Sequence, residues 1–141
     1  MQTNDMSTSV HMHVEVKKDG QWQHYSAPHI PTDHTFYDLI SGVYGKICPI
    51  AAPRGLPSDL SSMTAYCYAL DEKNFSRLHH QSWLGPEELL RLQQQLNELL
   101  PTTNPLDRDL EEGYLRCYIN NNAIAAHKGF EDARIIFWFD H

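Results

Sequence analysis

The C-terminal segment, residues 133–139, constrains the fold most, because apolar side chains fill successive positions there with only Arg134 between them. Side chains of a strand alternate between the two faces of a sheet, so this segment is apolar on both faces. Such a strand belongs in the middle of a sheet that is covered on both sides. We therefore expect a central strand here.

Residues 10–17 show the opposite pattern, a strict alternation of apolar and polar side chains. This alternation predicts a half-buried strand. Asp19-Gly20 then marks a tight hairpin turn, and residues 21–26 form the return strand. The apolar face carries Val10, Met12, Val14 and Val16, and the polar face carries His11, His13, Glu15 and Lys17.

Helical signals fill most of the remaining chain. Thr32 or Asp33 can cap a first helix, Ser58 a second one, and Gly85-Pro86 opens the clearest one. A strand over 75–83 precedes this last helix, and Asn120 to Asn122 read as a turn. The expected helices cover 35–44, 59–70, a segment from Pro86, and 107–119. The apolar stripe of the second helix would consist of Leu60, Met63, Cys67 and Leu70. That of the helix from Pro86 would consist of Leu89, Leu92, Leu96 and Leu99.

Together these elements predict one α+β domain over residues 10–141, with an antiparallel or mixed β-sheet and three to four helices. At 141 residues the chain has no room for two independent cores. Residues 1–9 are polar and are expected to form a disordered N-terminal tail. No apolar run approaches the roughly 18 residues of a membrane-spanning helix.

Charge and cysteine content narrow the classes of partner. The formal net charge is -7, and Lys17-Lys18 is the only adjacent basic pair, so a nucleic-acid partner is not expected. A basic protein or a small ligand in a local pocket stays open. Three widely spaced cysteines without a CxxC pair, and the absence of an apolar signal segment, predict a cytoplasmic protein. No sequence motif indicates a cofactor.

Arg54 is the first candidate for ligand binding. It lies in a proline-rich loop beside Gly55 and just before the expected helix cap Ser58. An arginine, a glycine that allows close approach and a helix N-terminus together favour an anion. The alternative is structural, with Arg54 paired to a carboxylate such as Asp59. Aromatic side chains that could stack on a purine are Tyr44, Trp83 and Trp22.

The histidines give two further hypotheses. His11, His13 and Glu15 have a spacing that can hold a divalent metal, but we favour the alternative, the polar face of a solvated edge strand, and expect no metal. His24 and His80 each lie in a His-x-Ser triplet. Paired triplets of this kind resemble the signature of the 2H phosphoesterases, in which one histidine is the general base and the other the general acid.

Three segments are distinctive when taken together: Pro49 to Asp59, His80 to Leu89 and Arg134 to Asp140. In this order they resemble a family of small uncharacterised proteins that recur in bacteriophages and prophages. Further support comes from the expected hairpin and the Tyr37 to Val43 segment, whereas residues 101–132 depart from the family pattern. Small accessory phage proteins often counter host defence, by blocking an effector protein or by sequestering or cleaving a nucleotide signal.

The expected function is therefore that of a phage-type accessory protein of the host bacterial cytoplasm that sequesters a small phosphate-bearing ligand, such as a nucleotide signal. Arg54 would hold the phosphate, His80 and Ser82 would form hydrogen bonds, and Trp83 would stack, with Tyr44 as a further contact. We expect a homo-oligomer, because such sites often lie at subunit interfaces. The alternatives are a protein inhibitor of a host defence protein and a 2H-like phosphoesterase using His24 and His80.

Overall fold

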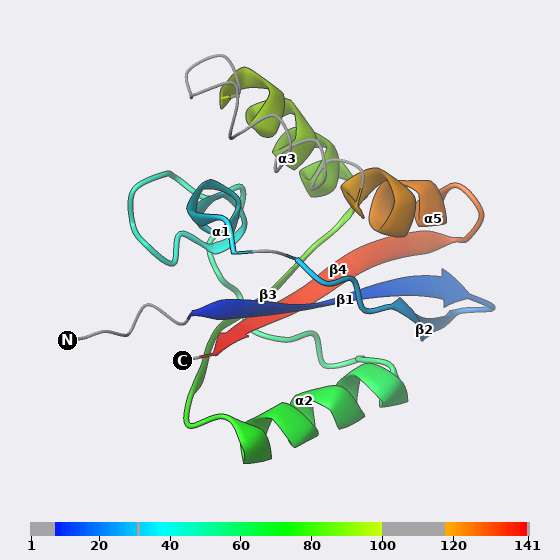
Figure 1. Cartoon of the computed structure of the whole chain (residues 1–141). Helices are drawn as coiled ribbons and strands as arrows, with labels where there is room; N and C mark the ends of the chain where they lie inside the picture. Colours follow the sequence, from blue (N-terminus) through cyan, green and yellow to red (C-terminus); the bar gives the residue numbers. More distant parts are fainter. Residues whose placement is uncertain (1–7, 31, 100–117, 141) are drawn as a thin grey trace.

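The computed structural model of the chain describes residues 8–30, 32–99 and 118–140. In this part an antiparallel four-stranded sheet has the order β2-β1-β4-β3 (Figure 1). β4 pairs with β1 on one side and with β3 on the other, as expected for a central strand. The strands are β1 (Ser9–Lys18), β2 (Gln21–Ser26), β3 (Leu78–Leu84) and β4 (Asp132–Asp140).

Helices cover both faces of this sheet, which confirms the single-domain α+β class (Figure 1). On one face lie α1 (His34–Ser41), α3 (Pro86–Leu99), the π-helical turn η3 (Asn120–Ile124) and the short α5 (Ala125–His127). Among the described helices, only α2 (Ser62–Asn74) lies on the other face. No helix in the described ranges is long and apolar enough to cross a membrane.

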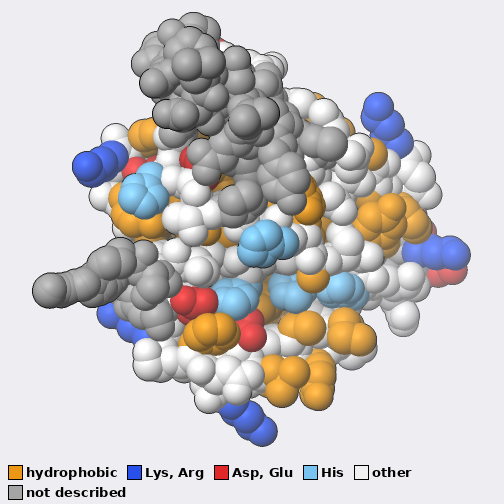
Figure 2. Space-filling model, viewed as in Figure 1, with side chains coloured by type: hydrophobic (Ala, Val, Ile, Leu, Met, Phe, Trp, Pro, Cys, Tyr) orange, Lys and Arg blue, Asp and Glu red, His pale blue; other side chains and the backbone are white. Residues whose placement is uncertain are grey.

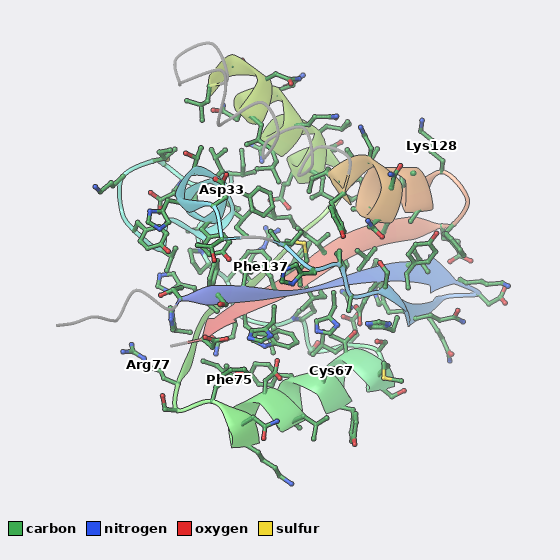
Figure 3. All side chains as sticks on the ribbon, viewed as in Figure 1. Asp33, Cys67, Phe75, Arg77, Lys128 and Phe137 are labelled. Atoms are coloured by element: carbon green, nitrogen blue, oxygen red, sulfur yellow. The ribbon has the colours of Figure 1, made fainter. Side chains whose placement is uncertain are left out.

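The main core lies between the sheet and the layer of α1 and α3. Val14 of β1 pairs with Ile135 of β4, and Met12 pairs with Phe137; all four residues are buried. Figure 3 shows Phe137 on the α1 side of the sheet. The apolar stripe predicted for the helix from Pro86 is confirmed on α3, and α1 has a buried stripe as well. The stripe of α1 buries Phe36, Leu39 and Ile40, and that of α3 buries Leu89, Leu92 and Leu96.

The ends of α1 follow from its capping residues. The carboxylate of Asp33 accepts a hydrogen bond from the Phe36 N–H at 2.8 Å, one of the two predicted caps. The helix ends at Ser41, earlier than expected, because Gly42 adopts the left-handed conformation with φ of 71°. The carboxylate of Asp38 then accepts three backbone N–H groups of the following loop, from Tyr44, Lys46 and Ile47.

The expectation that β1 is half-buried is wrong. His13 and Glu15, on its polar face, are 7% and 0% exposed, because α2 covers this face. Glu15 finds its partner on β4, where Arg134 Nη2 lies 2.7 Å from Glu15 Oε1. Burial opposes the charge of Glu15, but hydrogen bonds from Ser61, Thr64 and Arg134 lower its pKa.

α2 also departs from the sequence-based prediction, because it covers a polar face of the sheet. It begins at Ser62 after the cap Ser61, and not after Ser58. The predicted stripe does not face inward, since Met63 and Leu70 are 53% and 39% exposed. A helix that covers a polar sheet face turns polar groups inward, and Thr64 is the residue of α2 that is buried.

The remaining expectations differ at their boundaries or cannot be compared. The strand expected over 75–83 runs from Leu78 to Leu84, and the expected turn at Asn120 is the start of η3. β1 begins at Ser9, inside the expected tail, while residues 1–7 lie outside the described residues. The expected helix 107–119 lies outside them except for its last two residues.

The buried ion pair under α2 gives a test of this arrangement. Arg134→Met leaves the Glu15 carboxylate without its partner inside the protein, and we expect a loss of about 3–5 kcal/mol of unfolding free energy, measured by urea denaturation. Lys128→Met, at an exposed position, is the matched control. The double variant Glu15→Leu with Arg134→Met should recover part of the loss. A single variant as stable as the control would contradict the buried pair.

Candidate functional site

Arg54 lies at the outer edge of β3, where the proline-rich loop runs beside the strand. The Gly55 N–H donates to the Gln81 carbonyl at 2.9 Å, and the Arg54 N–H donates to the Ser82 hydroxyl at 3.2 Å. The guanidinium stacks 3.7 Å from the centre of the Trp83 ring and donates to the Trp83 carbonyl. The structure thus brings together three of the predicted site residues, Arg54, Ser82 and Trp83.

The anion that Arg54 was expected to hold is supplied by the chain itself. Arg54 Nη2 lies 2.6 Å from Glu88 Oε1, and the same oxygen accepts the Gly85 N–H at the start of α3. Burial alone would raise the pKa of Glu88, but these hydrogen bonds lower it, so the carboxylate carries its charge. This contact corresponds to the alternative interpretation, in which Arg54 pairs with a carboxylate of the chain, but the partner is Glu88 and not Asp59. Asp59 pairs with Arg134.

Three further residues that were expected to contact a ligand lie in other environments: Ser82, Tyr44 and Trp22. Ser82 is fully buried, so its hydroxyl positions the loop and does not face solvent. Tyr44 lies near α1, with its ring centre 4.3 Å from that of His34, and contacts none of the Arg54 group. Trp22 stacks under the Arg134 guanidinium at 3.9 Å.

His80 lies on the same strand as Ser82, in a distorted stretch. The register of β3 against β4 shifts between His79 and Ser82, and His80 has φ of 54°. A left-handed conformation is unfavourable for a histidine and costs on the order of 1 kcal/mol. The two neighbouring imidazoles meet with His79 Nδ1 2.8 Å from His80 Nδ1.

The charge near this bulge comes from Arg77, which sequence analysis did not single out. Burial lowers the pKa of His80, and the Arg77 guanidinium lowers it further. Arg77 is exposed and makes no ion pair or hydrogen bond within the described part of the chain (Figure 3). It precedes β3 in a short connection, and no motif marks such a residue. The bulge itself also leaves no signal in the sequence.

His24 and His80 do not face one cleft. His24 lies on β2 and His80 on β3, which are the two edge strands of the sheet. Two strands separate them, which corresponds to about 14 Å at the usual spacing between strands. The geometry that the phosphoesterase interpretation requires is absent.

His11 and His13 of β1 contact polar neighbours on the face under α2, and Figure 2 shows histidine and acidic side chains close together. His11 Nε2 lies 2.5 Å from Asp140 Oδ2, and His11 Nδ1 lies 3.3 Å from Asp71 Oδ2. His13 Nδ1 lies 3.0 Å from His24 Nε2. No group among the described residues could hold a metal ion. The alternative of a solvated edge strand is wrong, because β1 is an inner strand whose polar face α2 covers.

Two of the three cysteines can be described, and both are free thiols. Cys48 is exposed, whereas Cys67 is partly buried on α2. Burial and then the nearby Asp71 carboxylate raise the pKa of Cys67, which disfavours the nucleophilic thiolate. Cys117 lies outside the described residues.

We compared the chain with known proteins in three ways. A scan against protein-family models, a search of curated proteins and a search of solved structures each found no match. The resemblance to small phage proteins therefore stays a prediction.

The buried His13 predicts how stability depends on pH. Burial, with a smaller effect of His24, lowers its pKa from 6.5 to about 4 in the folded protein. Between these values the unfolded chain takes up a proton that the folded protein does not, so stability present above pH 6.5 falls as the pH is lowered toward 4. The shift corresponds to at most about 3 kcal/mol. Urea denaturation at several pH values measures this loss.

Two variants separate His13 from the other histidines. His13→Phe keeps an aromatic ring against Trp138 and should flatten the pH dependence. His34→Gln, at an exposed position, should leave it unchanged. Equal slopes in the wild type and in His13→Phe would show that His13 is not the group responsible.

Proposed function

We propose that the protein binds a small phosphate-bearing ligand at the outer edge of β3, as an accessory protein of phage type in the bacterial cytoplasm. The observation that carries the proposal is the strained His80, held in a bulge beside an Arg77 without a described counter-ion. Backbone strain persists where the surrounding structure enforces it, and such positions cluster at binding and catalytic sites.

The chemistry of this edge suits an anion. Arg77 can give two parallel hydrogen bonds to phosphate oxygens, and the His80 imidazole can donate a further one. A bound phosphate would also offset the repulsion by which Arg77 lowers the pKa of His80. The expected contacts thus change from Arg54 to Arg77, while His80 is retained.

Arg54, Ser82 and Trp83 then act as positioning residues. They fix the proline-rich loop along the strand next to the bulge, through the hydrogen bonds between Arg54, Ser82 and the Trp83 carbonyl. Binding without turnover is the use that fits best, since the second histidine of a two-histidine phosphoesterase would have to be His24 on the opposite edge.

A mix-and-heat assay tests the proposal. The protein is incubated with a panel of cyclic and linear nucleotides, and each nucleotide is quantified by chromatography before and after heat denaturation. We expect at least one nucleotide to disappear and to return intact on heating, which means sequestration. Conversion to a new species would show an enzyme instead.

Charge variants locate the site in the same assay. Arg77→Ala should weaken binding at least tenfold, and Arg77→Lys should recover part of it, because a lysine keeps the charge but not the paired hydrogen bonds. Arg91→Ala removes an exposed arginine from α3 and serves as the control. Unchanged affinity in a folded Arg77→Ala protein would refute this site.

A second candidate, docking to another protein, is favoured by an exposed apolar stripe on α2. Met63, Tyr66 and Leu70 follow helical spacing on its outer side, and Tyr66 is 61% exposed. Exposed apolar groups of this kind are typical of interaction surfaces. The stripe suits either the protein-inhibitor alternative or the expected homo-oligomer.

The oligomer is tested directly by sedimentation velocity. If a second copy covers the stripe, the wild type should sediment as a dimer and Tyr66→Lys as a monomer, because the lysine would place a charge in an apolar interface. Lys73→Ala, also exposed on α2, should remain dimeric. A wild type that stays monomeric at high concentration would contradict the homo-oligomer.

A further inference from the structure

A groove on the α2 side of the sheet offers a second binding site that the proposed phosphate site does not use. It encloses about 380 Å³ between β1, the segment after β2, and α2. This volume lies within the range of small-molecule sites. The residues that matter for its chemistry are His11, His13, Asp71 and Asn74, with apolar walls from Ala27 and Leu70.

The floor of the groove is a fixed hydrogen-bond network. Asp71 Oδ2 accepts from the Trp138 indole N–H at 2.9 Å and lies 3.3 Å from His11 Nδ1. The other nitrogen of His11 contacts Asp140. Asp71 Oδ1 makes no hydrogen bond within the described residues, so this oxygen remains as an acceptor for a ligand.

His13 supplies a second open polar atom. Its residue is only 7% exposed, and its ring stacks on Trp138 with the centres 5.0 Å apart. The Nδ1 atom contacts His24, whereas Nε2 has no partner in the described part of the chain. His13 is one of the residues that line the groove, so a ligand or water in the groove can satisfy a ring nitrogen that has no partner in the protein.

The charge balance identifies the kind of ligand. No lysine or arginine lines the groove. Asp71 and Asp140 both face the single imidazole of His11, so this group keeps a net negative charge even when His11 is protonated. A positively charged N–H donor with an apolar body matches the open Asp71 oxygen and the apolar walls.

We propose that this groove binds a small organic cation, an amidine or a primary amine, that donates hydrogen bonds to Asp71 Oδ1 and to His13 Nε2. His13 Nε2 accepts when His13 Nδ1 carries the proton and donates it to His24. This tautomer fits the observed contact between the two rings. The inference is independent of phosphate binding at β3.

Calorimetric titration with benzamidine tests the site, and benzamide, its uncharged analogue of similar shape, is the matched probe. We expect benzamidine to bind and benzamide to bind at least tenfold more weakly. Equal binding of the two, or no binding of benzamidine, would overturn the proposal.

Variants of two neighbouring carboxylates distinguish binding in the groove from non-specific attraction of benzamidine to acidic groups on the surface. Asp71→Asn should weaken benzamidine binding at least tenfold, whereas Glu72→Gln, exposed on the next residue of α2, should not. Equal losses in both variants would overturn the site. Because Asp71 also holds Trp138, the fold of Asp71→Asn is checked by near-UV circular dichroism.

The wild-type protein gives a readout that does not depend on any variant. Benzamidine should change the ¹⁵N chemical shift of His13 Nε2, which accepts the proposed hydrogen bond. A shift confined to exposed histidines such as His34 would overturn the proposal.

Discussion

The structure depends on the need to cover both faces of β4. This strand is buried along its length from Ala133 to Asp140, with Phe137 and Phe139 on one face and Trp138 on the other. A strand of this kind is stable only when both layers exclude water. The first face gains an ordinary apolar core from α1 and α3. The second face is covered by α2, and its chemistry is different.

The face under α2 is held by polar contacts in place of a second aliphatic core. Arg134 is bound by Glu15 and Asp59 and is stacked on Trp22, and His11 is held between Asp71 and Asp140. Buried charges are tolerated only when they are paired in this way. The inner side of α2 is therefore polar, which leaves its apolar residues Met63, Tyr66 and Leu70 exposed.

The sequence predicts the apolar core well and the polar face poorly. The alternation at residues 10–17, the leucines of α3 and the C-terminal run each follow from local periodicity. The burial of His13 and Glu15 does not, because polar side chains normally mark a solvated face. Only the approach of Arg134, 119 residues further along the chain, reveals that Glu15 is inside.

The candidate site, too, was predicted only in part, because some of its contacts depend on tertiary structure. Proximity of Arg54 to Ser82 and Trp83 was expected. The ion pair between Arg54 and Glu88 was not, because it depends on how the first turn of α3 places the Glu88 carboxylate next to Gly85. The left-handed His80 results from a bulge, a tertiary feature without a local signal. Arg77 becomes a candidate only once the structure shows that its charge acts on His80.

The central claim is that α2 covers the polar face of the sheet and buries the His13 ring. Its most direct test is to follow the ¹⁵N chemical shifts of the His13 ring by NMR from pH 8 to pH 4. The structure predicts that this imidazole stays uncharged until the pH approaches its pKa of about 4. A His13 ring that becomes protonated near pH 6.5, as in an exposed histidine, would contradict the covered polar face.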